Sequence, residues 1–231
     1  MLKPDGKPAC VSAGGYPRAE RLSKRVALWH HVTMTAFGFG TAKGQQMAPV
    51  TRVGVTVTFL RMDRAPRQAA PGLAPGFQTV RARSPSVAFY RYLYNTVGAD
   101  YLWWLRRMAS DEELEALLRD PAVSIHTLYA EGEPAGFFEL DARPWPDVNL
   151  SYFGLMPRSV GTGIGFAFLS AAVDEVWRQG PRGMTVNTCN ADHRRALPTY
   201  LRAGFRVVRQ VKEVWNVPNS LGLRIPATLR L

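Results

Sequence analysis

The apolar and polar residues of this chain follow two periods, one typical of β-strands and one typical of α-helices. Alternation with many β-branched residues predicts a strand in "RVGVTVTFLRM", residues 52–62. The stretch "SIHTLYAEGEPAGFFELDA", residues 124–142, predicts two strands joined by a tight turn at its Gly and Glu residues. Further strands are predicted at residues 147–157, where Pro157 ends the strand, at 183–189 and at 205–215.

Helical spacing appears between these strands. It predicts an aromatic helix at residues 84–98, and further helices at 163–179 and 192–203. A Ser/Glu capping box followed by a leucine stripe predicts a helix over "SDEELEALLRD", residues 110–120. Pro198 removes a backbone donor, so the last helix either begins near residue 195 or kinks.

The N-terminal residues follow neither period. Residues 1–46 mix Gly, Pro and charge, and they carry seven Lys or Arg against two acidic residues. We therefore expect a basic, disordered extension, with a start codon assigned too early, ahead of Met47, as an alternative. The folded domain is expected to span residues 47–231, with a Pro/Gly/Ala linker at 65–76 after its first strand.

Composition narrows the class of protein without naming its function. The chain has 231 residues, of which 46% are hydrophobic and 20% charged, as in ordinary globular proteins. Its net charge of +11 fits either an anionic partner or an arginine-rich coding bias. Cys10 and Cys189 can form at most one disulfide, so the cytoplasm is the expected compartment. The chain has no apolar run of about 20 residues, so we expect no membrane partner.

Three glycines at alternate positions stand in "RSVGTGIGFAFL", residues 158–169, between a predicted strand and a predicted helix. Such a loop presents unpaired N–H groups at the positive end of the helix dipole, which is a site for phosphate. The dinucleotide fingerprint fails because the sixth position from Gly161 is Phe166, and no Gly-Lys-Ser/Thr follows for a Walker loop. A helix start that needs only tight turns is the alternative.

The longer segments "YFGLMPRSVGTGIGFAFLSAAVDEVWRQG" and "MTVNTCNADHRRALPTYLRAGF" resemble the core of the GNAT superfamily of N-acyltransferases. The resemblance runs from about Val123 to Val214. Its later motif elements are Ala196, Tyr200 and Gly204-Phe205. It implies an α/β fold with a mixed, mostly antiparallel twisted sheet, which is flanked by helices and splayed between two central strands.

The resemblance also implies acetyl-CoA as acyl donor, with the pyrophosphate of coenzyme A held by the amides of the glycine loop. Two positions depart from the family pattern. Val160 replaces the usual Gln or Arg, and His193 replaces an Asn that here stands three residues earlier as Asn190, so either side chain is expected at the pantetheine arm. The expected cofactor-binding residues are Phe153, Gly154, Leu155, Val160, Gly161, Thr162, Gly163, Ile164, Gly165, Asn190 and His193.

Transfer of an acetyl group to an amine needs a proton acceptor, an oxyanion donor and a proton for the leaving thiolate. Glu139 lies on the same strand face as Phe137 and Asp141, so we expect a partly desolvated carboxylate that acts as base. An ordered water or a merely solvated Glu139 is the alternative. The resemblance assigns the oxyanion to a backbone N–H near Leu155 and the proton donor to Tyr200, although a helix tyrosine can also serve packing alone.

The acceptor is the least determined partner. The aromatic segment "FYRYLYNTVGADYLWWLRRM", residues 89–108, is expected to shape a pocket for a small-molecule primary amine. A peptide or protein amine, or a non-catalytic acyl-CoA-binding module, is the alternative. We expect no nucleic-acid partner, because RNP and helix-turn-helix patterns are absent, and no metal, because the four His lack ligand spacing. A homodimer is left open.

Overall fold

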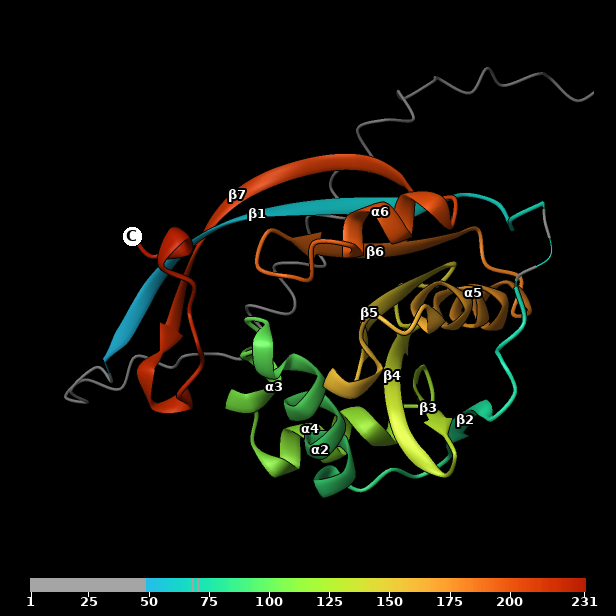
Figure 1. Ribbon diagram of the computed structural model, residues 1–231, viewed down its shortest axis with the longest axis horizontal. Helices are drawn as coiled ribbons and strands as arrows, with labels where there is room; N and C mark the ends of the chain where they lie inside the picture. Colours follow the sequence, from blue (N-terminus) through green and yellow to red (C-terminus); the bar gives the residue numbers. More distant parts are fainter. Residues whose placement is uncertain (1–48, 68, 70) are drawn as a thin grey trace, which may run out of the picture. The chain divides into compact units, whose positions relative to one another are not determined.

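Seven strands form one sheet in the order β2-β3-β4-β5-β6-β1-β7 (Figure 1). All neighbouring strands pair antiparallel except β5 and β6, which are parallel. The predicted fold class, a mixed and mostly antiparallel sheet flanked by helices, is therefore confirmed. The strands are β1 (Val50–Met62), β2 (Phe77–Ala82), β3 (Val123–Ala130), β4 (Glu133–Asp141), β5 (Asp147–Leu155), β6 (Gly183–Cys189) and β7 (Arg206–Pro218).

This structure is a computed structural model that describes residues 49–67, 69 and 71–231. The expected basic extension at residues 1–46 and the alternative start at Met47 lie outside the described residues. Within the described ranges, the α-helices are α2 (Val87–Val97), α3 (Leu105–Met108), α4 (Asp111–Arg119), α5 (Ile164–Trp177) and α6 (Ala196–Arg202).

Strand β1 lies between β6 and β7 in the sheet. β1 pairs with β6 through residues 57–62 and with β7 through residues 50–61. Because β6 is shorter than β1 and β7, these two strands continue past the end of β6 as a curved two-stranded ribbon (Figure 1). The C-terminal tail reaches this ribbon, where Arg230 forms an isolated bridge with Val53.

Different helices cover the two faces of the sheet. Successive residues of β4 point to opposite faces, because side chains alternate along a strand. Phe138 contacts Phe168 of α5, with 5.3 Å between ring centroids. Its neighbour Glu139 contacts Tyr90 of α2, and α3 and α4 lie beside α2 (Figure 1). We call the first of these faces the α5 face and the second the α2 face.

Local signals place the helix ends. The predicted capping box is confirmed, since the Ser110 hydroxyl accepts from the Glu113 amide at 3.2 Å and the Glu113 carboxylate accepts from the Ser110 amide at 2.8 Å. The last helix is shorter than the predicted 192–203, because α6 begins at Ala196. Pro198 is therefore its third residue, where a backbone N–H has no helical partner to lose. Neither β2 nor α3 was among the predicted elements.

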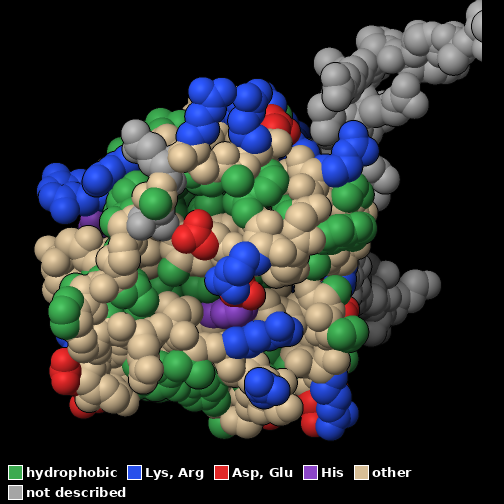
Figure 2. Space-filling model, turned by 90° about the vertical axis from the view of Figure 1, so that its right-hand side faces the viewer, with side chains coloured by type: hydrophobic (Ala, Val, Ile, Leu, Met, Phe, Trp, Pro, Cys, Tyr) green, Lys and Arg blue, Asp and Glu red, His purple; other side chains and the backbone are tan. Residues whose placement is uncertain are grey.

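The surface carries its charge in separate places. On the face drawn in Figure 2, Lys and Arg side chains lie at several points, some of them next to Asp or Glu, rather than in one continuous patch. Within the described ranges, the structure has no helix with the length and apolar character needed to cross a membrane.

Buried His126 makes the stability of the fold depend on pH. The ring stacks on Phe138 at 4.6 Å, and only 4% of the residue is exposed. Burial lowers its pKa from 6.5 to about 4, an effect that the charge of Glu175 opposes and those of Arg81 and Arg178 reinforce. The folded state therefore favours the neutral ring, and stability is lost as pH falls from the unfolded pKa toward the folded one.

We predict that His126→Phe, which keeps the stacked ring, flattens this pH dependence. Between about pH 8 and about pH 5 the wild type should lose about 2 kcal/mol more unfolding free energy than the variant. Urea unfolding at a series of pH values measures the difference. Parallel curves for the two proteins would show that His126 protonates equally in both states.

Candidate active site

The two central strands separate after a short parallel ladder. Residues 147–150 pair with residues 183–186, and the rest of β5 has no partner on β6. At the same point Ser151 is an extra residue between the pairs that β4 makes with Leu150 and Tyr152, which is a β-bulge. A bulge bends its strand, and here it directs the second half of β5 away from β6. In residues 151–155 of β5, the backbone N–H groups that point toward β6 therefore have no strand partner.

The glycine loop follows β5 and opens α5. Gly161 and Gly163 have φ values of +86° and +91°, which favour glycine, and an added Cβ at either would have no atom within 4 Å. The Thr162 hydroxyl donates to the Ser159 carbonyl at 2.9 Å and holds the loop. Within the described residues, the amides of Gly161, Thr162 and Gly163 donate to no other group. The loop therefore offers bare, open N–H groups at a helix N-terminus, which fit a pyrophosphate.

The residues on either side of this loop have different surroundings. The Val160 amide donates to the Pro157 carbonyl at 3.3 Å, so it is already paired. Ile164 and Gly165 are the first two residues of α5, where helical N–H groups have no partner within the helix. A Cβ at Gly165 would lie 3.6 Å from Cδ1 of Leu155, so the end of β5 lies against the start of the helix.

The end of β5 packs tightly on both faces. Phe153 lies on the α5 face, with its ring 5.2 Å from Phe168 and 6.3 Å from Tyr200. Gly154 lies on the α2 face, where an added Cβ would come within 2.4 Å of Cγ1 of Val97. A side chain at Gly154 would therefore push α2 away from the strand.

Tyr200 lies on α6 beside the separated strands. It is 6% exposed, and its ring also meets Phe205 nearly edge-on at 5.9 Å. Its hydroxyl donates to no described residue. Burial, and after it the charge of Asp192, raises the pKa of this phenol above its ordinary value. The hydroxyl therefore keeps its proton until a strong acceptor is presented.

The two candidates for the pantetheine arm have different partners. The side-chain oxygen of Asn190 accepts from the Thr56 amide at 2.9 Å, and the Asn190 amide donates to the Thr56 carbonyl at 3.3 Å. Asn190 thus extends the contact between β6 and β1. His193 is exposed, and its Nδ1 accepts from the Arg195 amide at 3.2 Å just before α6.

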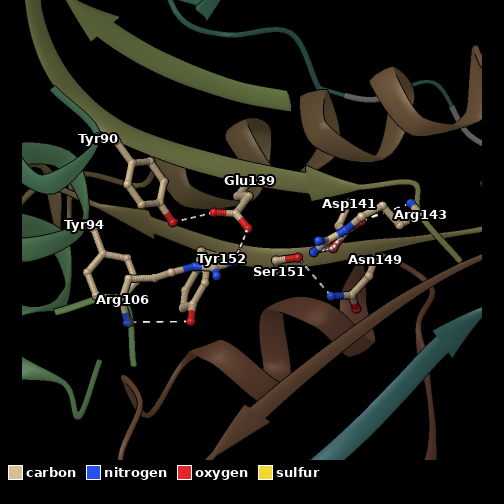
Figure 3. Close-up of polar contacts among 9 residues, drawn as sticks. All are labelled: Tyr90, Tyr94, Arg106, Glu139, Asp141, Arg143, Asn149, Ser151 and Tyr152. Atoms are coloured by element: carbon tan, nitrogen blue, oxygen red, sulfur yellow. Dashed lines mark hydrogen bonds and ion pairs between the residues drawn. The ribbon is translucent and has the colours of Figure 1, made fainter. Parts of the chain in front are cut away.

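Glu139 is at the centre of a buried polar network on the α2 face (Figure 3). It is 0% exposed, which is deeper than the partial burial that we predicted from the sequence. One carboxylate oxygen accepts from Arg106 at 2.9 Å and the other from the Tyr90 hydroxyl at 2.5 Å. The Arg106 amide in turn donates to the Tyr94 hydroxyl at 3.3 Å, and its guanidinium lies 5.6 Å from the centre of the Tyr152 ring.

Charge and burial oppose each other within this network. Burial would lower the pKa of Arg106, but the charge of Glu139 and the neighbouring tyrosines together outweigh it and hold the pKa well above the ordinary value. Burial, followed by the charge of Glu139, raises the pKa of Tyr90. Arg106 therefore stays cationic and Tyr90 neutral. Glu139 and Tyr200, the predicted base and acid, share no hydrogen bond.

Arg106 and Tyr152 were not among the predicted site residues. Arg106 stands in the aromatic segment at residues 89–108, where an arginine among Trp, Leu and Tyr gives a weak signal of burial. Its acidic partner is far away in sequence, so a single sequence does not reveal the pair.

Other side chains limit the chemistry of the site. Burial, with the charge of Asp192, raises the pKa of Cys189 to about 12, so this thiol is protonated at neutral pH and is a poor nucleophile. Among the described residues, no group of three or more His, Cys, Asp or Glu could hold a metal ion.

The acetyltransferase (GNAT) family model matches residues 80–205, which is more than half of the chain. The chain belongs to the GNAT family. The matched region runs from β2 to the end of α6, so β1 and β7 of this GNAT protein lie outside it. The resemblance inferred from the glycine loop and the last helix is thereby confirmed.

Solved structures share the fold at low sequence identity. A Drosophila protein has a TM-score of 0.52 at 16% identity, over 74% of this chain and 54% of that one. A GCN5-related N-acetyltransferase from Sphaerobacter thermophilus has a TM-score of 0.50 at 16% identity, over 74% and 53%. A tandem GNAT protein from the clavulanic acid biosynthesis pathway has a TM-score of 0.51 at 16% identity, over 83% and 69%.

This GNAT chain therefore spans about half the length of the first two of these structures. No curated protein matches it significantly.

We predict that Glu139→Gln destabilises the fold strongly, because it leaves the buried Arg106 charge without its counter-ion. The expected loss is about 3–5 kcal/mol of unfolding free energy, measured by urea unfolding. Glu115→Gln is the matched control, because it removes the same charge from an exposed pair with Arg119. That variant should lose less than about 1 kcal/mol. Equal losses would show that burial of the Glu139 pair contributes nothing.

Proposed function

We propose that this GNAT protein transfers an acetyl group from acetyl-CoA directly to a primary amine of a small molecule. The observation that carries the proposal is the pair of open features at the same end of β5, namely the bare amides of Gly161–Gly163 and the separation from β6. The loop would hold the pyrophosphate, and the gap between the strands would hold the arm that ends in the thioester.

Two positions predicted from the sequence then have a task in the proposed reaction. Acetyl-CoA supplies the activated acyl group when bound. A backbone N–H near Leu155 would stabilise the oxyanion, because β5 has no strand partner on this side. The Tyr200 hydroxyl, which binds no described residue, would protonate the leaving thiolate. The high pKa of Cys189 supports direct transfer over an acyl-cysteine intermediate.

The proton acceptor is the least defined part of the proposal. For Glu139 to act as base, its carboxylate must first release Arg106 or Tyr90, since both oxygens are bonded. An ordered water is the alternative, and the closed network around Glu139 favours it.

The acceptor assignment is tested by measuring CoA release with a panel of small amines and peptides. Turnover with small amines alone supports the proposal, whereas turnover with peptides alone favours a protein or peptide N-acetyltransferase. Tight acetyl-CoA binding without CoA release from any acceptor favours a non-catalytic acyl-CoA-binding module.

We predict that Gly163→Asp abolishes acetyl-CoA binding, because the carboxylate would occupy the position proposed for the phosphates. Calorimetry should show at least about a 100-fold weaker affinity, as expected for a charge placed against a bound anion. Gly180→Asp, at the other end of α5, is the matched control because Gly180 also has a positive φ of +69° and open space around it. An affinity that falls equally in both variants would indicate strain rather than loss of the site.

We also predict that Tyr200→Phe lowers turnover by about 100- to 10,000-fold, the range for a lost general acid, with acetyl-CoA affinity nearly unchanged. The ring and its packing are kept, so the melting temperature should stay close to that of the wild type. Tyr129→Phe, on β3 and outside the aromatic segment, is the control and should have full activity. Wild-type turnover by Tyr200→Phe on a verified acceptor would limit Tyr200 to packing.

A further inference from the structure

The carboxylates near the separated strands differ in whether a cation neutralises them. Glu139 pairs with Arg106, and Asp141 pairs with Arg143 at 2.5 Å. Asp192, in the loop between β6 and α6, forms no ion pair with any described Lys, Arg or His. Unlike Glu139 and Asp141, Asp192 therefore has no described cation that neutralises its charge.

Hydrogen bonds hold Asp192 in one position. Its Oδ2 accepts from the Thr188 hydroxyl at 2.8 Å and from the Cys189 amide at 2.9 Å. The side chain of Trp103, from the α2 face, lies close enough to lower the pKa of the carboxylate. Asp192 thus connects the loop that leads to Tyr200 with the aromatic segment on the acceptor side of the sheet.

Groups from both central strands and from α6 lie within electrostatic reach of Asp192. Burial raises the pKa of Tyr101, Tyr152, Cys189 and Tyr200, and the charge of Asp192 adds to the rise in each. Burial raises the pKa of Asp192 itself, against the lowering effect of its hydrogen bonds. A carboxylate with a raised pKa binds a proton more readily near neutral pH.

We propose that Asp192 accepts the proton that the acceptor amine must lose, through an ordered water. This inference rests on the proposed acetyl transfer. Asp192 fits the place where amine and thioester must meet, because it lies in the loop after β6, beyond the last pair of that strand with β5, and this loop leads to the helix that carries Tyr200.

The proton balance of the step is complete. The ammonium form of the acceptor gives one proton through water to Asp192, and the nitrogen lone pair then forms the C–N bond. The C–S bond breaks with its electron pair on sulfur, and the thiolate takes the proton of Tyr200. The second proton lost by nitrogen returns to the tyrosinate, and Asp192 releases its proton to solvent.

The test compares Asp192→Asn with Thr188→Val on an acceptor that the wild type acetylates. Asp192→Asn should lower kcat by about 100- to 10,000-fold, and its rate should rise with pH in proportion to the neutral amine. Thr188→Val removes a hydrogen bond to the carboxylate and keeps the carboxylate, so it should retain the form of the wild-type pH profile, shifted to higher pH because that bond lowers the pKa of Asp192. A merely structural role would make the two variants alike.

Two further measurements keep the test decisive. Asp192→Glu should restore part of the wild-type pH profile, which covers the case in which Asp192→Asn does not fold. NMR titration of the Asp192 carboxyl carbon in the free protein should give a pKa above the ordinary value of about 4. Turnover within about threefold of the wild type in Asp192→Asn, or a carboxyl pKa at or below the ordinary value, overturns the proposal. Absence of wild-type turnover with every amine and peptide overturns the proposed function, and this inference with it.

Discussion

The separation of β5 from β6 after Leu150 is the constraint on which the candidate site depends. A parallel pair in the middle of a sheet normally continues, because an unpaired and buried backbone N–H costs about 1–3 kcal/mol. Here the ladder stops where the bulge at Ser151 begins, and aromatic side chains pack on both faces of the strand beyond it. The open edge is therefore a fixed feature of the fold, and a ligand can satisfy its N–H groups without any strand having to move.

The α2 face supports this edge through a buried ion pair rather than through apolar packing alone. Removing two charges from water is costly, and the bonds of Glu139 to Arg106 and Tyr90 offset part of that cost. The pair fixes Arg106 next to Tyr152 on the α2 face of β5. Stability and site shape thus rest on the same contacts.

Much of this fold could be predicted because its signals are local. The alternating strands, the Ser110 capping box and the strand at residues 183–189 each lie within a dozen residues of sequence. The glycine loop was located for the same reason. The full burial of Glu139 was not predicted, because the alternation of side chains along a strand tells which face a side chain takes but not what covers that face. The Arg106 ion pair and the position of β1 depend on contacts between residues far apart in the chain, which a single sequence does not reveal.

The place of β1 between β6 and β7 has a consequence for how the protein is made. Val57 pairs with both Cys189 and Val211, so β1, the first strand of the described residues, can be paired only after more than 120 further residues have been synthesised. At about 5–20 residues per second, that delay is roughly ten seconds. During this time an alternating apolar strand has two free edges, which are templates for pairing with other chains. We therefore expect the yield of native protein to depend on the rate of translation relative to the rate at which unfinished chains associate.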